Sequence, residues 1–169
     1  VTIRWSNQSK PSLGGVGLFL GFLSALILYQ IIEPDFNIFS DLQFLGLFFA
    51  AAMAFFMGLA DDAYDTKPLF KLFIQISCGV FLLFTGTAIE LFHHETIDGI
   101  ITVIWVIILM NSLNMLDNMD GITATTVLFI LLSCLVSAIL IGQEANQYWI
   151  YILIAVIGSV LGFLKYNIN

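Results

Sequence analysis

The sequence predicts an all-α integral membrane protein of about six transmembrane helices. Of its 169 residues, 60% are hydrophobic and only 10% are charged, whereas a soluble domain carries about a quarter charged residues. The apolar residues form continuous runs, which are typical of membrane helices and not of the alternating strands of a membrane barrel. The formal net charge of −7 argues against a nucleic-acid partner, because phosphate backbones bind clustered lysine and arginine.

Each predicted span is close to the roughly 20 residues that a helix needs to cross a bilayer. The six apolar runs cover about residues 15–32, 42–60, 69–89, 99–116, 122–141 and 148–164. Turn residues separate the runs, and Pro68 stands near the start of the third, where proline is well tolerated in a helix. We expect a single transmembrane domain over residues 1–169, truncated at both ends and forming a piece of a larger polytopic bundle.

The basic residues predict which membrane side each connection faces. If the spans alternate in direction, all five basic residues fall on one side, namely Arg4, Lys10, Lys67, Lys71 and Lys165. The positive-inside rule assigns that side to the cytoplasm. The acidic residues of the opposite connections, Asp41 and Asp98 among them, are then expected to be solvated residues of external loops.

The segment from Asn111 to Gly121 carries polar side chains at the end of the fourth predicted span. At about 100° per residue, an arc of roughly 120° holds most of them, while Asp120 lies outside it; the residues within the arc are Asn111, Asn114, Asp117, Asn118 and Gly121. Amide side chains in a bilayer need partners inside the protein or in a wet cleft. The stripe therefore predicts a polar active-site wall or, alternatively, a hydrogen-bonded seam between helices.

An aspartate pair, Asp61-Asp62, follows the second predicted span on the same side of the membrane. Ionisable residues at such depth mark a functional site by default. Adjacent carboxylates repel each other, which favours a nearby cation or a shared proton. Mg²⁺ prefers oxygen ligands and shares them with phosphates, so we expect Mg²⁺ here, with Asp62 and Asp117 as candidate ligands. The alternative is a solvated loop that caps the next helix.

Three motifs occur in an order that resembles a known family. They are Lys10-Pro11-Ser12-Leu13-Gly14-Gly15, then Asp61-Asp62 with Lys71 and Gln75 downstream, and then Asn111-x-x-Asn114-x-x-Asp117-x-x-Asp120-Gly121. They are similar to the motifs of bacterial polyprenyl-phosphate N-acetylhexosamine-1-phosphate transferases. That family includes phospho-N-acetylmuramoyl-pentapeptide transferase and undecaprenyl-phosphate GlcNAc-1-phosphate transferase. The closing segment from Gly162 to Asn167 is similar to the next landmark of the family.

The resemblance implies transfer of a HexNAc-1-phosphate from UDP-HexNAc to undecaprenyl phosphate, with release of UMP and with Mg²⁺ as the cofactor. The short loop from Lys10 to Gly15 is closer to the GlcNAc branch, and the muramoyl-pentapeptide branch is the alternative. The implied location is the bacterial cytoplasmic (inner) membrane, crossed several times, with the active site on the cytoplasmic side.

The implied site residues divide into catalytic and substrate-binding sets. The catalytic candidates are Asp61, Asp62, Asp117 and Asp120, and the substrate-binding candidates are Lys10, Lys71, Asn111, Asn114, Asn118, Met119 and Asn167. Asp61 would deprotonate or orient the lipid phosphate, and Lys10 and Lys71 would hold phosphates as point charges. Asp117 with Asn114 would position metal and nucleotide.

Two other classes of membrane protein share parts of this pattern. A CDP-alcohol phosphotransferase also has an Asp-x-x-Asp-Gly sequence, but Ile122 follows Gly121 here where that family has Ala-Arg. A cation or proton transporter also uses intramembrane carboxylates, but its site lies near the midplane, at broken helices. We expect the isolated chain to be inactive, because the resembling family continues past Asn169 to a further Mg²⁺ motif.

Small-residue pairs predict close helix packing. Gly17 with Gly21, and Gly158 with Gly162, have the four-residue spacing that lets two helix backbones approach each other. Such contacts form within one chain or between two chains, which leaves a homodimer open.

Overall fold

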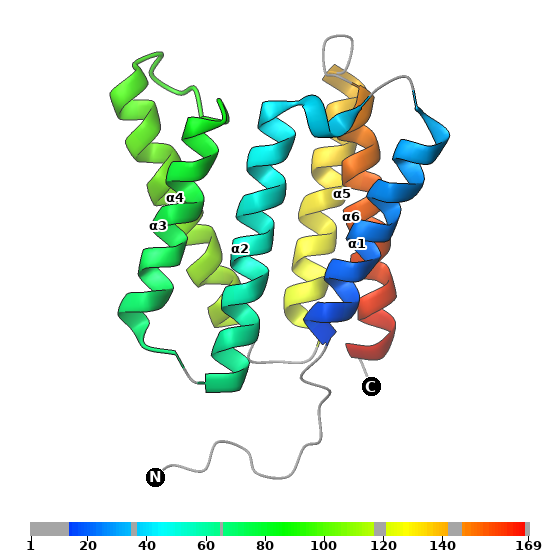
Figure 1. The fold of residues 1–169 in the computed structure, drawn as a ribbon, viewed down its shortest axis with the longest axis horizontal. Helices are drawn as coiled ribbons and strands as arrows, with labels where there is room; N and C mark the ends of the chain where they lie inside the picture. The colour runs from blue at the N-terminus through cyan, green and yellow to red at the C-terminus, as the bar shows by residue number, and fades with distance from the viewer. Residues whose placement is uncertain (1–13, 35–36, 65, 117–120, 142–146, 168–169) are drawn as a thin grey trace.

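The computed structural model describes residues 14–34, 37–64, 66–116, 121–141 and 147–167. These residues form an all-α structure, drawn in Figure 1, in which long helices run alternately up and down. The elements are α1 (Gly14–Ile32), the short 3-10 helix η1 (Ile38–Ser40), α2 (Leu42–Tyr64), α3 (Pro68–Phe84), α4 (Glu95–Leu116), α5 (Ile122–Ile141) and α6 (Gln147–Asn167).

The helices pack in two groups that lie side by side (Figure 1). In one group α3 lies between α2 and α4, and in the other α6 packs against both α1 and α5. Narrower contacts of α1 with α2 and of α4 with α5 join the groups. The first group carries most of the polar residues of the candidate site, and the second group contributes the ends of α5 and α6.

Five helices of the described part are long and apolar enough to cross a membrane, which confirms the predicted fold class. Large apolar side chains are exposed along most of them, as expected for helices whose solvent is lipid. Helix α3 is shorter than these five: it has 17 residues and is therefore at the short limit for a membrane span. The sequence predicted 69–89 for this span, and that boundary is wrong at its C-terminal end.

Helix α3 ends early because Gly86 supplies a left-handed terminus. Gly86 has φ of 79°, and its N–H donates to Leu83 O at 3.0 Å while Thr87 N–H donates to Leu82 O at 2.9 Å. This pair of bonds is the Schellman motif, which satisfies the last carbonyls of a helix and turns the chain away.

Helix α4 begins earlier than the predicted residue 99, and Asp98 explains why. Its carboxylate accepts hydrogen bonds from the backbone N–H groups of Leu91, Phe92 and His94, at 3.2, 2.9 and 3.0 Å. Asp98 is 5% exposed, so the prediction that it is a solvated loop residue is wrong. Its charge is used inside the protein, where it fixes the connection between α3 and α4.

Two other helices extend beyond their predicted ends, and both extensions carry polar residues. Helix α2 was expected to end near residue 60 but continues to Tyr64, which places Asp61 and Asp62 on its last turn. Helix α6 was expected to end near residue 164 but continues to Asn167. The predicted spans 15–32 and 122–141 agree closely with α1 and α5.

Glycines allow close approach within the group of α2, α3 and α4. A Cβ added to Gly46 on α2 would lie 1.8 Å from Thr85 Oγ1, and one added to Gly79 on α3 would lie 3.0 Å from Val103 Cα on α4. Of the glycines in the two predicted packing pairs, only Gly21 makes a close contact within the described structure: a Cβ added there would lie 3.1 Å from Ser159 Oγ. The other three have no described atom within 4 Å of an added Cβ; they are Gly17, Gly158 and Gly162.

One cluster of buried apolar residues lies toward the end of the bundle that contains η1 and the start of α2, opposite to the end where α2 finishes. They come from α1, η1, α2 and α6, and they are Phe22, Leu26, Ile38, Phe44, Tyr148 and Ile152. At their edge the hydroxyl of Tyr148 donates to Asp41 Oδ2. Asp41 Oδ1 also accepts from the N–H groups of Gln43 and Phe44, at 2.8 and 3.1 Å, and so caps α2.

Candidate functional site

The predicted site residues that the structure describes lie at one end of the bundle. The C-terminal ends of α2, α4 and α6 and the N-terminal ends of α3 and α5 meet at the lower side of Figure 1. The lysines of the described helices, Lys71 and Lys165, belong to these ends, as does Lys67, the N-cap of α3. The segregation of positive charge that the sequence predicted is therefore present in the described part of the fold.

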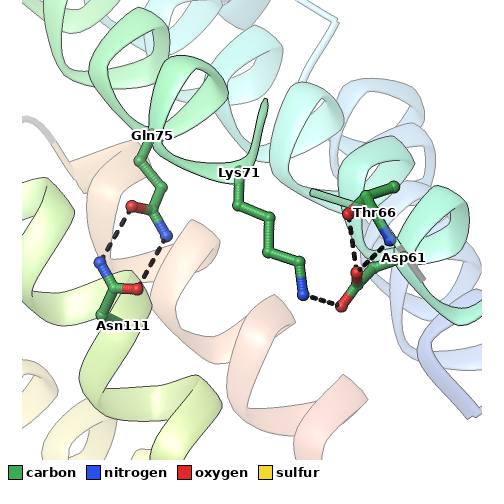
Figure 2. Close-up of polar contacts among 5 residues, drawn as sticks. All are labelled: Asp61, Thr66, Lys71, Gln75 and Asn111. Carbon is green, nitrogen blue, oxygen red and sulfur yellow. Dashed lines mark hydrogen bonds and ion pairs between the residues drawn. The ribbon is translucent and has the colours of Figure 1, made fainter. Parts of the chain in front are cut away.

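Asp61 is the centre of a hydrogen-bond network on the last turn of α2. Its Oδ1 accepts from Thr66 N–H at 3.1 Å and from Thr66 Oγ1 at 2.7 Å, and its Oδ2 lies 2.6 Å from Lys71 Nζ. Figure 2 shows both partners reaching Asp61 from the chain that follows α2. The network closes the turn between α2 and α3, and Pro68 at the first position of α3 sets the helix direction.

The ion pair of Lys71 with Asp61 is partly shielded from solvent. Their side chains are 26% and 24% exposed, respectively. A charge pair at this depth is held more firmly than one on an open surface, because water and salt screen it less. Enough of the ammonium stays accessible for an anion to approach it, which is what a phosphate-binding lysine requires.

Asp62 follows Asp61 on the last turn of α2 and is exposed. Successive helical residues point about 100° apart, so the two carboxylates face different directions. Asp61 is engaged by Lys71 and Thr66. Asp62 is exposed at this end of α2, and its role as a metal ligand stays a prediction.

Asn111 lies in a seam between two helices. Its Nδ2 donates to Gln75 Oε1 at 2.9 Å, and Gln75 Nε2 donates to Asn111 Oδ1 at 3.2 Å, as Figure 2 shows. The seam was the alternative that the sequence left open, and the structure places Asn111 in it. Asn114, one turn further along α4, is exposed at the same end of the bundle.

Asn167 connects the C-terminal end of α6 to the N-terminal end of α5. Its Oδ1 accepts from Gly121 N–H at 2.7 Å, so the last residue of α6 holds the residue that precedes α5. Gly121 is buried and has φ of 74°, a conformation that glycine adopts without a steric penalty. Asn167 was predicted to contact substrate, and its described contact is with the backbone of the predicted motif.

Several predicted site residues lie outside the described residues. They are Lys10, Asp117, Asn118, Met119 and Asp120. Within the described part of the chain, no group of three or more histidine, cysteine, aspartate or glutamate side chains is arranged to hold a metal ion. The described part brings together Asp61, Lys71 and the helix end that carries Asn111 and Asn114.

Sequence reasoning assigned no role to two residues that the structure places in the network. Thr66 was expected only as part of a turn, although a hydroxyl before Lys67-Pro68 can reach back to the preceding helix end. Gln75 was named in the sequence only as a member of the motif that begins with Asp61-Asp62, without a role of its own. Gln75 is only 5% exposed, and this burial is the physical reason why its amide needs a polar partner.

Comparison with known proteins decides the family. Residues 44–169 match the model of the family described as "Glycosyl transferase family 4". The chain belongs to this family. The match covers α2 to α6 and so includes each described residue of the site, which confirms the resemblance drawn from the motifs.

The curated relatives of this glycosyl transferase family 4 chain carry related names. A "probable undecaprenyl-phosphate N-acetylglucosaminyl 1-phosphate transferase" of Bacillus subtilis is 23% identical over 96% of this chain and 45% of its own length. A "decaprenyl-phosphate N-acetylglucosaminephosphotransferase" of Mycobacterium leprae is 25% identical over 94% of this chain and 44% of its own. A "phospho-N-acetylmuramoyl-pentapeptide-transferase" of Streptococcus uberis is 28% identical over 96% and 52%.

The chain thus spans about half the length of the curated relatives it matches. No solved structure matches it.

Proposed function

We propose that the protein transfers a HexNAc-1-phosphate, namely GlcNAc-1-phosphate, from a UDP-sugar to undecaprenyl phosphate and releases UMP. The proposal places the reaction at the cytoplasmic face of the bacterial cytoplasmic membrane, where the positive-inside rule puts the lysine-bearing ends. The observation that carries it is the pairing of Lys71 with Asp61, at the membrane end of a chain of glycosyl transferase family 4.

The reaction joins two anions, and this sets the task of the site. An oxygen of the lipid phosphate attacks the phosphorus that bears the sugar, and the bond from that phosphorus to the bridging oxygen breaks. UMP leaves with the electron pair of that bond. Catalysis of such a step consists mainly of aligning the two reactants and neutralising their charge. Lys71 supplies a positive charge at the correct membrane end and binds a phosphate oxygen.

The contacts of Asp61 support a positioning role over a general-base role. Its oxygens already accept three hydrogen bonds, from Lys71 and from two groups of Thr66. A lipid phosphate monoester has its second pKa near 6, so much of it has lost its proton at neutral pH. Asp61 therefore orients Lys71, and the lipid phosphate attacks without needing Asp61 to take a proton.

Mg²⁺ belongs to the proposal as the partner of the phosphates. The donor set at this end is made of carboxylate and amide oxygens, which are the ligands Mg²⁺ prefers. Asp62 and Asp117 would hold it. Bound there, the metal would neutralise charge on the diphosphate of the donor.

Two sugar donors are compatible with the names of the relatives. The GlcNAc branch is favoured because the Bacillus subtilis and mycobacterial relatives are named for N-acetylglucosamine. The muramoyl-pentapeptide donor is the second candidate, because the streptococcal relative is named for it.

The test uses membranes that contain the protein expressed from its complete gene. Sugar-labelled UDP-GlcNAc, Mg²⁺ and undecaprenyl phosphate are supplied, and label entering lipid is followed for wild type, Lys71→Gln and the matched control Lys67→Gln. Label in lipid for wild type and control, lost in Lys71→Gln, supports the proposal. Label only with the muramoyl-pentapeptide donor would change the sugar, and no transfer from any UDP-sugar by folded protein would refute the function and favour a transporter.

A further inference from the structure

A reciprocal pair of amide hydrogen bonds links α3 to α4, about one helical turn beyond Lys71 toward the middle of the bundle. Gln75 and Asn111 each donate to and accept from the other, at 2.9 and 3.2 Å. Asn111 Nδ2 also donates to Ile107 O at 2.9 Å, within its own helix. In Figure 2 the two side chains face each other across the gap between their helices.

The pair specifies one arrangement of the two helices. Gln75 is 5% exposed, and a buried primary amide in a membrane needs both an acceptor and a donor. Asn111 provides both at once. Sliding α3 along α4 by one residue would separate both hydrogen bonds together and leave the buried amide of Gln75 without its partners.

Close packing reinforces the same register deeper in the bundle. Gly79 follows Gln75 by one helical turn, and a Cβ there would lie 3.0 Å from Val103 Cα of α4. The two backbones are therefore near contact beyond the amide pair. The pair and the glycine contact together hold α3 and α4 as one unit.

Each residue of the amide pair lies about one helical turn from a residue of the proposed site, Lys71 on α3 and Asn114 on α4. Lys71 precedes Gln75 by four residues, which is about one turn of α3, and Asn114 follows Asn111 by three residues, about one turn of α4. The register that Gln75 and Asn111 fix therefore sets how the backbone of Lys71 on α3 lies relative to that of Asn114 on α4.

We infer that Gln75 and Asn111 are positioning residues. They hold α3 and α4 so that Lys71 and Asn114 can contact the same diphosphate ligand. The inference rests on the proposed function, because it assigns the aligned groups to the donor's diphosphate. It also assigns Asn111 to the support of the site and not to contact with substrate. Shifts of about 1 Å in such an arrangement cost up to about 100-fold in rate.

The test compares kcat and KM for sugar transfer by the full-length protein in membranes. Gln75→Leu and Asn111→Leu should each lower kcat/KM by about 10- to 100-fold per folded enzyme, mainly through kcat. The exchange variant Gln75→Asn with Asn111→Gln keeps two amides and their summed length, and it should recover most of the loss. Ser77→Val is the matched control on α3, since the Ser77 hydroxyl bonds within its own helix to Phe73 O, and it should leave both constants unchanged.

A second comparison separates positioning from general stability. If the amide pair acts through Lys71, then Gln75→Leu added to Lys71→Gln should cost little more than Lys71→Gln alone. Full additivity, or wild-type kcat in folded Gln75→Leu, would overturn the inference while leaving the transferase function intact. An inactive wild-type protein would instead count against the proposed function itself.

Discussion

Lys71 Nζ lies 2.6 Å from Asp61 Oδ2, across the turn that joins α2 to α3. The pair joins the two elements that meet at this membrane end and holds the ammonium where a phosphate can reach it. Under the proposed function, Asp61 orients the Lys71 ammonium instead of taking a proton from the lipid phosphate. Lys71 keeps the phosphate-binding role that was expected from the sequence.

Substitution at Lys71 should therefore affect transfer more than the same change nearby. We expect Lys71→Gln to lower kcat/KM by about 100- to 1,000-fold, the range found for removal of one charge-stabilising group. Lys71→Arg should retain part of the activity, because its charge is kept but its shape is not. Initial rates of lipid labelling measure this, with Lys67→Gln as the control.

Asp61→Asn should reduce transfer without abolishing the fold. The amide keeps the shape of the side chain but loses the charge that holds the ammonium, so we expect a loss in kcat/KM close to that of Lys71→Gln. The double variant should be little worse than either single one, because both act as a unit. Two independent losses that multiply would contradict the pairing as a functional contact.

The side chain of Thr66 should contribute to activity through its hydroxyl. Its Oγ1 donates to Asp61 Oδ1 at 2.7 Å, so Thr66→Val removes one hydrogen bond to a carboxylate and leaves the side-chain volume nearly unchanged. We expect a drop in kcat of about 10- to 150-fold, which corresponds to the roughly 1.5–3 kcal/mol of a hydrogen bond to a charged group. Thr66→Ser keeps the hydroxyl and should behave as wild type. Equal rates for Val and Ser would remove Thr66 from the network.

Asn167 should act through its side-chain oxygen. Oδ1 accepts from Gly121 N–H at 2.7 Å, and Asn167→Asp keeps that acceptor while Asn167→Leu removes it. We expect Asn167→Leu to lower transfer about 10-fold and Asn167→Asp to retain more of it, as measured by kcat at saturating donor. The opposite ranking would favour direct contact of the Asn167 amide with substrate, the role that the sequence resemblance implied.

The glycine contacts predict where added methyl groups are tolerated. A Cβ at Gly46 would lie 1.8 Å from Thr85 Oγ1, whereas none of the described atoms is within 4 Å of a Cβ at Gly162. Gly46→Ala should lower stability by about 1–3 kcal/mol, and Gly162→Ala, also in a helix, should be neutral or slightly stabilising. Thermal unfolding in detergent measures both. A neutral Gly46→Ala would show that α2 and α3 are not held this closely.

Asp41 predicts how stability changes in acid. The Tyr148 hydroxyl holds the pKa of the Asp41 carboxyl below its usual range, partial burial acts in the opposite direction, and the amides of Phe44 and Gln43 lower the pKa further. A folded-state pKa below the unfolded one means that this stabilisation is present at neutral pH. It is lost as the pH falls from about 4 through the lower folded value.

Tyr148→Phe should remove part of this acid-dependent stability and so flatten the fall in melting temperature below about pH 4. Tyr151→Phe is the matched control on the same helix, because the ring of Tyr151 contacts Tyr29 and takes no part in the Asp41 contact. Equal acid profiles for the two variants would contradict the role of the Tyr148 hydroxyl.

Hydrophobic runs predicted the helices well, because a long apolar segment is stable as a helix in lipid whichever helices it packs against. Helix ends were harder to predict. The Gly86 terminus of α3 was visible as a Thr-Gly-Thr sequence inside an apolar region, but the run itself continued to residue 89. The extension of α2 to Tyr64 could not be read from apolarity, because its last turn is polar.

Polar contacts were predicted least completely, because they depend on which helices are neighbours. The sequence placed Asn111 on a polar stripe but could not select between a site wall and a seam, since the choice depends on Gln75 facing it from α3. Asp98 was expected in solvent because of its place near a loop. Its burial follows from three backbone N–H groups that only the folded loop brings together.

The most direct test of the proposed chemistry follows the phosphorus that bears the sugar. UDP-GlcNAc radiolabelled at its β-phosphorus is supplied to membranes containing the protein from its complete gene, together with undecaprenyl phosphate and Mg²⁺. Transfer of a sugar phosphate predicts label in the lipid and release of unlabelled UMP, with both lost in Lys71→Gln and kept in Lys67→Gln. Label remaining in released UDP while sugar enters the lipid would mean that the sugar moves without its phosphate, and would contradict the proposed sugar-phosphate transfer.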